Sequence, residues 1–286
     1  MQYHTPSSFD DAVALAKDAQ GVTRFLAGGT DVLVQLRADI VTPDVLIDIK
    51  KIAGVSDITR EGDGWRIGVA VTGAEMSEHD TLGKEWPGLL EAMDLIGSTQ
   101  VQGRATLTGN LCNGSPAADS VPAMVAAGVT VTVTGPNGER RVAVEDIPTA
   151  PGKTSLEAGE LVTAVHVPAR GKSGGDAYLR FIPRTEMDIA VVGCGVNLRL
   201  DGKKIVEARV ALGAVAPTVL LVEEAAKAII GTELDDAALN ALAAAASAAC
   251  NPIDDKRGTV KFRTHVAGVL AKRAAKIAYQ RAEAAS

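Results

Sequence analysis

This chain of 286 residues has two short segments that are rich in glycine and small polar residues, between stretches of hydrophobic sequence. Their composition favours a phosphate-binding function. The first, LAGGTD (26–31), carries two adjacent glycines followed by a threonine. Glycine tolerates φ > 0 and leaves backbone N–H groups uncovered, and successive N–H groups in such a turn form a concavity that binds anions. The segment could therefore hold a phosphate or pyrophosphate. A tight turn between a strand and a helix, with no ligand, is the alternative.

The second segment, ATLTGNLCNGSPAAD (105–119), has similar chemistry. Four short side chains in it can donate hydrogen bonds: Thr106, Asn110, Asn113 and Ser115. Gly109 and Gly114 allow another molecule to approach the backbone closely. Asp119 ends the segment with a carboxylate, which suits ribose hydroxyls because it accepts two hydrogen bonds. The two segments could hold one long phosphate-bearing ligand from both sides, or they could be connections only.

Motifs for other chemistries are missing from the sequence. The first segment does not follow the GxGxxG pattern of dinucleotide-binding Rossmann folds, and no GxxxxGK[ST] pattern supports ATP hydrolysis. The three cysteines (112, 194 and 250) and the four histidines lack the spacing of metal ligands. No nucleophile, base and orienting residue can be assigned to one site. We therefore expect no metal site and no catalytic side chain, so that a bound cofactor would perform any chemistry.

The N-terminal elements that position these segments follow from periodicity and turn residues. Ser8 followed by Asp11 predicts a helix over 8–19. Residues 23–29 read as a short strand that runs straight into a glycine turn, and 44–49 and 65–72 read as strands. Residues 88–97 read as a helix, 105–119 as a loop and 122–128 as a short buried helix. Residues 129–144 predict a hairpin around Pro136, Asn137 and Gly138, and residues 160–168 another strand.

The pattern changes after a glycine-rich, charged stretch at 169–177, which we interpret as a domain boundary. YLRFIPR, DIAVVGCGVNLRL and KKIVEARVALGAV predict three strands, and Asp201-Gly202 predicts the turn between the last two. Segments 218–230, 235–249 and 259–283 read as helices. The expected fold is α+β, with a C-terminal unit of antiparallel strands covered by helices.

Composition and charge narrow the class of protein. A net charge of −6 argues against nucleic acid as a partner, because such domains carry a strong positive excess. The N-terminal residues do not read as a signal peptide, and no segment has the length of a membrane span, so we expect a cytoplasmic protein. From Lys256 onward there are eight Lys or Arg and one acid, Glu283. This bias indicates either a solvated helix or a docking surface for an acidic partner.

Three motifs, in order, resemble one family. LAGGTDVL, ATLTGNLCNGSPAAD and RFIPRTEMDIAVV (180–192) are similar to segments of the FAD-binding subunit or domain of the molybdenum hydroxylases, which include xanthine dehydrogenase and carbon monoxide dehydrogenase. The resemblance covers essentially the whole chain. It implies two α/β subdomains (1–55 and 56–172) that form an FAD-binding unit like that of vanillyl-alcohol oxidase. It also implies a C-terminal α+β domain (173–286) with a three-stranded antiparallel sheet and helices.

The resemblance also implies where FAD lies. Residues 27–32 would wrap the pyrophosphate with backbone N–H groups, and the second segment would complete the cradle, with Asp119 on ribityl or ribose hydroxyls. Ile96 and Val162 would be apolar walls, Arg180 would lie near the cofactor, and residues 184–189 would run close to the isoalloxazine ring. The implied FAD-binding residues are Ala27, Gly28, Gly29, Thr30, Asp31, Val32, Ile96, Ala105, Thr106, Gly109, Asn110, Cys112, Asn113, Ser115, Asp119, Val162, Arg180 and Ile189.

The chain departs from the family pattern at two positions. Thr108 replaces one of two adjacent glycines, and Ile189 stands where many bacterial members carry a tyrosine, which leaves the electron acceptor open. Arg184 and Asp188 could serve the flavin or form a structural ion pair.

The resemblance finally implies an assembly. A large subunit would carry a molybdenum cofactor and a small subunit two [2Fe-2S] clusters, as a dimer of heterotrimers. This chain would pass electrons from a cluster through FAD to an external acceptor. A flavin-free scaffold subunit and a stand-alone flavin oxidase are the alternatives.

Overall fold

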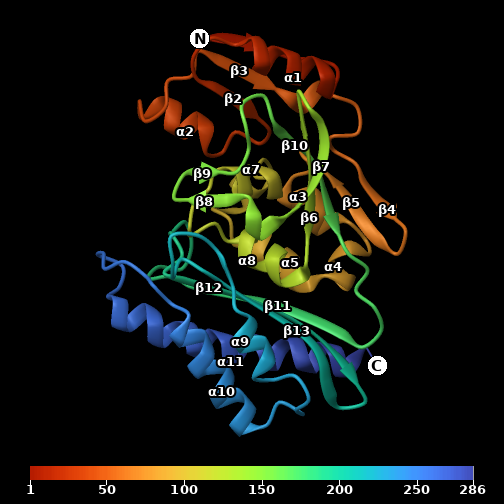
Figure 1. Cartoon of the computed structure of the whole chain (residues 1–286), viewed down its shortest axis with the longest axis vertical. Helices are drawn as coiled ribbons and strands as arrows, with labels where there is room; N and C mark the ends of the chain where they lie inside the picture. The colour runs from red at the N-terminus through yellow and green to blue at the C-terminus, as the bar shows by residue number, and fades with distance from the viewer. Residues whose placement is uncertain (286) are drawn as a thin grey trace.

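Three β-sheets follow one another along the long axis of the molecule, in chain order (Figure 1). A computed structural model describes residues 1–285. The predicted α+β class is confirmed, with mixed α/β elements in the N-terminal part and an antiparallel sheet with helices at the C-terminus. A separate two-stranded hairpin, β8 (Pro148–Ala150) and β9 (Lys153–Thr154), lies against the second polar segment, where Gly152 N–H donates to Gly114 O over 2.9 Å.

The first sheet is parallel, with strand order β1-β3-β2. Its strands are β1 (Gln2–His4), β2 (Thr23–Leu26) and β3 (Val45–Asp48). Ser8 caps α1 (Phe9–Asp18) by accepting a hydrogen bond from the N–H of Asp11, as the sequence predicts. The short helix α2 (Val32–Arg37) was not predicted, because it buries no residue and so shows no apolar stripe. One 3₁₀ turn, Ile49–Lys51, follows β3.

The second sheet is antiparallel, with order β4-β5-β10-β6-β7. Its strands are β4 (Ile58–Glu61), β5 (Gly64–Gly68), β6 (Thr130–Gly135), β7 (Gly138–Ala143) and β10 (Leu161–Val167). The predicted hairpin is confirmed, since β6 and β7 pair around Pro136 and Asn137. A 3₁₀ turn, Val144–Asp146, follows β7. Six helices join the strands: α3 (Gly73–Glu78), α4 (Leu82–Glu85), α5 (Pro87–Asp94), α6 (Thr99–Gln102), α7 (Leu107–Cys112) and α8 (Ser120–Ala127).

Two predictions in this part are wrong in detail. The strand expected over 65–72 ends at Gly68, where the chain turns to bond the loop before β4: Gly68 N–H donates to Asp57 O and Ala70 N–H to Val55 O. Val69 and Val71 are buried by that turn, so the apolar pattern continues without a strand. The loop expected over 105–119 contains α7, because Thr106 supplies a helix cap that composition alone does not reveal.

The third sheet has the order β11-β12-β13-β14 and is antiparallel. Its strands are β11 (Gly174–Phe181), β12 (Val192–Asp201), β13 (Lys204–Gly213) and the two-residue β14 (Leu220–Leu221). The sequence predicted three strands and a helix over 218–230. The structure places the fourth strand at the start of that segment and restricts the helix, α9, to Glu223–Lys227.

The glycine-rich stretch 169–177 is only in part a linker, because β11 already begins at Gly174. A Cβ atom on Gly175 would lie 2.0 Å from the carbonyl oxygen of Ala278, in the C-terminal helix. The glycine therefore serves close packing between a strand and a helix rather than flexibility.

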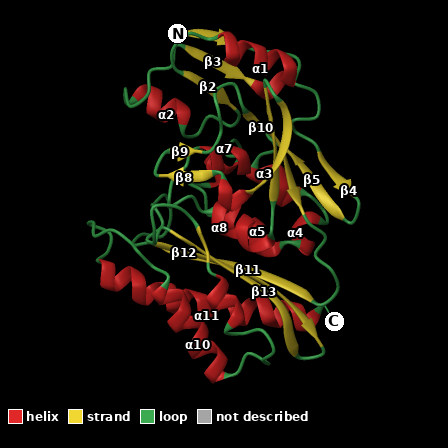
Figure 2. Cartoon of the chain, viewed as in Figure 1, coloured by secondary structure: helices red, strands yellow, loops and turns green. Residues whose placement is uncertain are grey.

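Helices cover both faces of the third sheet (Figure 2). The long helix α11 (Val260–Ala284) packs on β11 and β12, and α10 (Asp236–Ala248) packs on α11. On the other face α5 contacts β11, and α8 contacts β12 and β13. This contact joins the C-terminal sheet to the part of the chain that carries both polar segments. No helix within residues 1–285 is long and apolar enough to cross a membrane.

Candidate cofactor site

The first polar segment lies at the carboxyl edge of the parallel sheet, where β2 and β3 end side by side with Leu26 paired to Asp48. Tyr3 donates its hydroxyl to Asp48 Oδ2 over 2.6 Å, and Lys50 Nζ lies 2.7 Å from Asp48 Oδ1. Lys50 also donates to Ala27 O over 3.2 Å. These contacts fix the chain where it leaves β2. The carboxyl edge of parallel strands is the usual place for a ligand in such sheets.

Five consecutive backbone N–H groups in this segment, those of residues 28–32, have no acceptor among the described residues. The Thr30 hydroxyl likewise has none. Gly29 is in the left-handed region, with φ +81°, which suits glycine. Unsatisfied N–H groups in such a row form a concavity for an anion. The segment therefore fits the pyrophosphate of a nucleotide cofactor.

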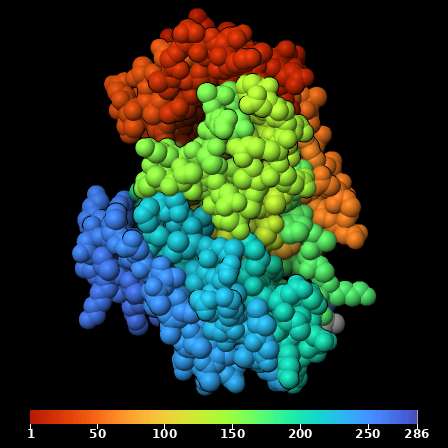
Figure 3. All heavy atoms as spheres, viewed as in Figure 1, coloured from red at the N-terminus to blue at the C-terminus, as the bar shows by residue number. Residues whose placement is uncertain are grey.

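The two polar segments touch at Gly28. A Cβ atom there would lie 1.8 Å from Arg104 O and 3.4 Å from Ala105 Cα, so only glycine allows this approach. Ala105 is buried, and its carbonyl accepts from Gly73 N–H over 2.9 Å. The space-filling view shows a hollow between the red-orange surface of the first sheet with its helices and the green surface around hairpin β8–β9 (Figure 3). The predicted residues of the two segments thus come together as expected.

Within the second segment, two predicted residues hold helix ends. Thr106 Oγ1 accepts from Gly109 N–H over 2.9 Å and caps α7. Asn110 Oδ1 accepts from Ser120 N–H over 3.1 Å and from the Ser120 hydroxyl over 2.7 Å, and so caps α8 in place of Asp119. The Thr108 hydroxyl is buried without a partner in the described chain. Side-chain capping therefore fixes this segment before any ligand binds.

A hydrogen-bonded bridge joins the two segments at a second point. Asn113, which caps the end of α7, donates its amide to Asp31 Oδ1 over 3.1 Å. Gln35, on α2, donates to Asn113 Oδ1 over 3.0 Å. Burial raises the pKa of Asp31. We call these three residues the bridge. It links elements 78 and 82 residues apart in the chain.

Asp119 and Arg180 form a buried ion pair with a distance of 2.7 Å between Oδ2 and Nη1. Tyr178, which is fully buried, donates its hydroxyl to Asp119 Oδ1 over 3.0 Å. Burial raises the pKa of Asp119 to about 6, although Arg180 and the Tyr178 hydroxyl oppose the shift. Arg180 Nε is buried without a partner in the described chain. These residues tie the end of the second segment to β11, in the third sheet.

The remaining predicted residues are more dispersed. Val162 lies on β10 within the hydrophobic core, and Ile96 is half-buried against that core. Cys112 is on α7, half-buried against the core, and burial raises the pKa of its thiol to about 12, which disfavours the reactive thiolate. Ser115 Oγ accepts from Ala117 N–H over 3.3 Å. Ile189 is 52% exposed on the loop after β11.

The sequence analysis did not predict four residues that lie around the site: Gln35, Asp48, Lys50 and Tyr178. Polar residues directly after a buried parallel strand, as at Asp48 and Lys50, are a signal that could have found two of them. Gln35 and Tyr178 lie in ordinary-looking helix and strand sequences, so only the tertiary contact reveals them.

The chemistry of this site is binding rather than side-chain catalysis. No group of three or more His, Cys, Asp or Glu residues that could hold a metal ion occurs in residues 1–285. A cavity of about 450 Å³ lies at the junction of α8, the linker after β10 and the third sheet, and its lining contains none of the predicted site residues. The two polar segments remain the candidate site, and their donors match an extended phosphate-bearing cofactor.

Comparisons with known proteins agree with this geometry. Residues 1–170 match the family described as FAD binding domain in molybdopterin dehydrogenase. Residues 177–278 match the family described as CO dehydrogenase flavoprotein C-terminal domain. Together the two matches include both polar segments and most of the third sheet with its helices.

Similar proteins extend over nearly the whole chain. The carbon monoxide dehydrogenase medium chain of Afipia carboxidovorans is 36% identical over 98% of this chain and 97% of its own length. The xanthine dehydrogenase FAD-binding subunit of Escherichia coli is 32% identical over 95% of this chain and 93% of its own.

Solved structures agree as well. A crystal structure of Cu,Mo-CO dehydrogenase matches with a TM-score of 0.95 at 36% identity, over 98% of both chains. Quinoline 2-oxidoreductase from Pseudomonas putida matches with a TM-score of 0.90 at 26% identity, over 99% of this chain and 98% of that one. The chain therefore belongs to the FAD-binding medium subunits of the molybdenum hydroxylase family, and is an oxidoreductase subunit that binds FAD.

Proposed function

We propose that this chain is the electron-transfer subunit of a molybdenum-containing hydroxylase or dehydrogenase. It receives electrons from a [2Fe-2S] cluster on a partner subunit and passes them through FAD to an external acceptor. FAD supplies the redox chemistry, because its ring can accept and release electrons. The chain contributes binding, orientation and a defined surface for its partners.

The row of five unpaired N–H groups at residues 28–32 is the observation that carries this proposal. These residues are half-buried, so solvent reaches their donors until a ligand replaces it, and a row of free N–H groups at a helix start suits the oxygens of a pyrophosphate. In the proposed complex these groups and the Thr30 hydroxyl bind the pyrophosphate. Thr106, Gly109 and Asn110 shape the opposite wall, and the bridge keeps the two walls at a fixed separation.

The other residues of the site receive narrower roles. Asp119 accepts hydrogen bonds from ribityl or ribose hydroxyls, with Arg180 holding its carboxylate in place. Ile96 and Val162 form apolar walls. Ile189 lies beside the isoalloxazine ring, on a loop with Arg184 and Asp188, and its side chain can exclude water but cannot donate a hydrogen bond. We propose three units, residues 1–55, 56–172 and 173–286, with the flavin bound between the first two.

The proposed partners are a large subunit with a molybdenum cofactor and a small subunit with two [2Fe-2S] clusters, assembled as a dimer of heterotrimers. The names of the similar proteins support this arrangement, since they are medium chains or FAD subunits of dehydrogenases. The substrate belongs to the molybdenum subunit, and carbon monoxide and xanthine dehydrogenases are both among the relatives.

The test is a measurement on the protein isolated from its own host together with its bound partners. We expect about one FAD per chain after acid release, broad iron–sulfur absorbance from a smaller partner, and bleaching of the flavin band when substrate is added without oxygen. Addition of an acceptor should restore the band.

Three results would overturn the proposal. A colourless chain that still binds its partners would make it a flavin-free scaffold. A flavin that reacts with substrate in the purified single chain would make it a stand-alone oxidase. A flavin that is present but never reduced in the complete complex would contradict the electron-transfer role while leaving FAD binding intact.

A further inference from the structure

Lys50 belongs to neither polar segment, yet its side chain reaches the first of them. Its Nζ atom donates to the carbonyl oxygen of Ala27 over 3.2 Å. Leu26 is the last residue of β2 that pairs with β3, opposite Asp48, so the carbonyl of Ala27 lies beyond the ladder of the sheet. Lys50 therefore supplies a donor at the point where the chain leaves the strand and enters the row of free N–H groups at residues 28–32.

The Lys50 ammonium is itself fixed by Asp48. The Oδ1 atom of Asp48 lies 2.7 Å from Nζ and also accepts from the backbone N–H of Lys50 over 3.0 Å. The Oδ2 atom accepts from the Tyr3 hydroxyl over 2.6 Å. Burial raises the pKa of Asp48, but the hydrogen bonds from Lys50 and Tyr3 lower it overall. Asp48 is therefore an ionised anchor for the lysine.

The geometry of the peptide bond converts this contact into control over one donor of the site. In a planar trans peptide the C=O and the N–H point in opposite directions. The carbonyl of Ala27 and the N–H of Gly28 belong to the same peptide, which is trans. When Lys50 holds the carbonyl on its own side, the N–H of Gly28 must face the other side. That N–H is the first of the five without an acceptor among the described residues.

Glycine makes such a restraint necessary at this position. Gly28 and Gly29 follow the carbonyl of Ala27 directly, and glycine populates more backbone conformations than other residues. Glycine cannot be replaced at 28, because a Cβ atom there would lie 1.8 Å from Arg104 O. A rotated peptide would turn its carbonyl oxygen, in place of its N–H, toward a phosphate and repel it. The restraint must therefore come from outside the segment.

The charge of Lys50 adds to the effect of its position. Hydrogen bonds from ionised donors are about twice as strong as those between neutral groups. Hydrogen bonds in a chain also polarise one another, so a cation on the carbonyl of Ala27 makes the N–H of Gly28 a better donor. Neither polar segment, 26–31 or 105–119, contains a Lys or Arg of its own. Lys50 thus brings positive charge to a site whose own donors are neutral.

We propose that Lys50, fixed by Asp48 and Tyr3, is a positioning residue for the pyrophosphate of FAD. It holds the peptide between Ala27 and Gly28 so that the N–H of Gly28 faces a phosphate oxygen. Lys50 acts through this peptide and does not touch the cofactor. This inference rests on the proposed function, because it requires the pyrophosphate to lie at residues 28–32.

The test compares the full chain, freed of flavin, in the wild type and in Lys50→Met, which keeps an unbranched side chain but removes the ammonium. We expect the Kd for FAD to rise at least about tenfold, because one hydrogen bond to a charged phosphate loses its orientation. Lys51→Met is the matched control, since Lys51 is the exposed next residue and makes no ion pair within residues 1–285. It removes the same charge and should leave the Kd within about twofold.

Two smaller ligands separate an effect on the phosphate site from a general loss of structure. ADP carries the pyrophosphate without the flavin ring, and riboflavin carries the ring without a phosphate. Lys50→Met should raise the Kd for ADP by the same factor as the Kd for FAD, and should leave the Kd for riboflavin unchanged. An equal rise for riboflavin would contradict the inference, because it would show a structural role for Lys50.

Two milder variants keep the test decisive if Lys50→Met does not fold. Lys50→Arg retains a cationic donor and should bind FAD within about threefold of the wild type. Tyr3→Phe removes only one hydrogen bond of Asp48 and should raise the Kd for FAD and for ADP about threefold, with riboflavin unaffected. Wild-type affinity for FAD and ADP in Tyr3→Phe and in any folded Lys50→Met would overturn the role of Lys50.

A failure of the underlying proposal gives a different result. If Gly28→Val retains FAD, the pyrophosphate does not lie at residues 28–32, and the proposed placement of the cofactor is wrong together with this inference. If Gly28→Val loses FAD while Lys50→Met binds it as the wild type does, the placement stands and only the role of Lys50 is wrong.

Discussion

Asn113 is the side chain that joins the two polar segments of the candidate site. Both ends of its amide are occupied, one by Asp31 and one by Gln35, across the junction of the two polar segments. The sequence motif predicts it as an FAD-binding residue, and the bridge explains its value as a residue that keeps the two segments together. A residue with this positioning role should therefore affect the affinity of the protein for FAD.

We therefore expect Asn113→Ala to raise the Kd for FAD by up to about thirtyfold, because two partly buried hydrogen bonds worth about 1 kcal/mol each are lost. Asn137→Ala, in the exposed turn between β6 and β7, is the matched control and should leave the Kd unchanged. Titration of FAD fluorescence with each protein measures both. An unchanged Kd in the Asn113 variant would show that the bridge does not hold the site.

Asp119 makes stability depend on pH in a direction that can be predicted. Its folded pKa, about 6, lies above the ordinary 3.8, so the folded state binds more protons between these values. The free energy of unfolding of the wild type, relative to Asp119→Asn, should therefore be largest at low pH. It should decrease by up to about 3 kcal/mol as the pH rises through 6.

Urea unfolding of both proteins between about pH 4.5 and 7 measures this difference. A difference that grows with pH would contradict the prediction and would show that the Arg180 ion pair, rather than burial, sets the pKa of Asp119.

Among the elements, the turn after β2 depends on close approach of backbone to backbone. Because a Cβ atom on Gly28 would lie 1.8 Å from Arg104 O, even Gly28→Ala must displace one polar segment from the other. We expect the affinity for FAD to fall by more than about a hundredfold in this variant, and by still more in Gly28→Val.

Gly103→Ala is the control one residue from Arg104, since its Cβ atom would meet only Gln100 O at 3.5 Å and its φ of −64° is ordinary. The flavin content of the purified proteins gives the result. Stoichiometric flavin in the Gly28→Val protein would show that the turn after β2 does not bind FAD.

The elements also show what periodicity can and cannot predict. Ser8 and α1, the hairpin of β6 and β7, and α10 and α11 follow local rules of capping, turns and apolar spacing, and the structure confirms them. The helix α2 does not follow these rules, because it buries no residue. The end of β5 does not follow them either, because the apolar pattern continues beyond the strand through a buried turn. Burial, not local periodicity, decides such cases.

At the scale of the whole molecule, the third sheet is held to the N-terminal part by buried charge as well as by apolar packing. Asp176, on β11, is 4% exposed and ion-paired with Arg170, whose guanidinium lies over the Trp86 ring. Burial raises the pKa of Asp176. Arg281 on α11 pairs with Glu91 on α5 across the same junction.

Asp176→Ala should therefore destabilise the protein by about 3–5 kcal/mol, because it leaves the buried Arg170 without its carboxylate. Asp63→Ala, at an exposed position between β4 and β5, should change the stability by less than about 0.5 kcal/mol. Thermal unfolding with FAD bound compares them. Equal melting temperatures would mean that Asp176 and Arg170 contribute nothing net to the junction.

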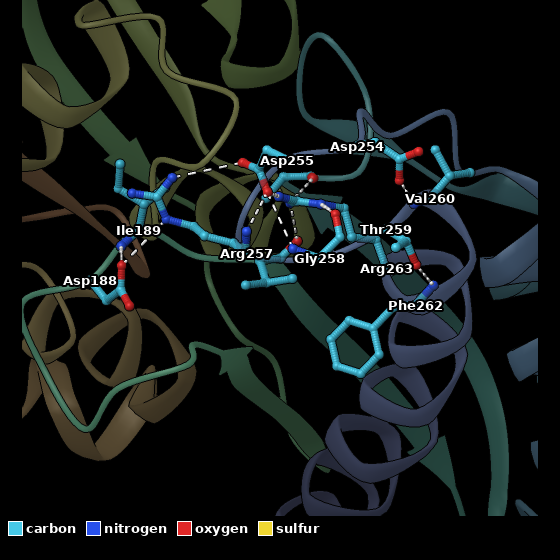
Figure 4. Close-up of polar contacts among 12 residues, drawn as sticks. Asp188, Ile189, Asp254, Asp255, Arg257, Gly258, Thr259, Val260, Phe262 and Arg263 are labelled. Atoms are coloured by element: carbon cyan, nitrogen blue, oxygen red, sulfur yellow. Dashed lines mark hydrogen bonds and ion pairs between the residues drawn. The ribbon is translucent and has the colours of Figure 1, made fainter.

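The sequence by itself determined the α+β class, most helices and strands, and the two polar segments with their preference for a phosphate group. These depend on local chemistry: glycine at positive φ, caps, turns and the spacing of apolar residues. Only the tertiary structure decided which donors stay free, how Gln35 and Asn113 bridge the segments, and how Arg257 joins the loop after β11 to the residues before α11 (Figure 4). Those contacts join residues far apart in the chain, and neither spacing nor composition encodes a partner that packing alone brings within reach.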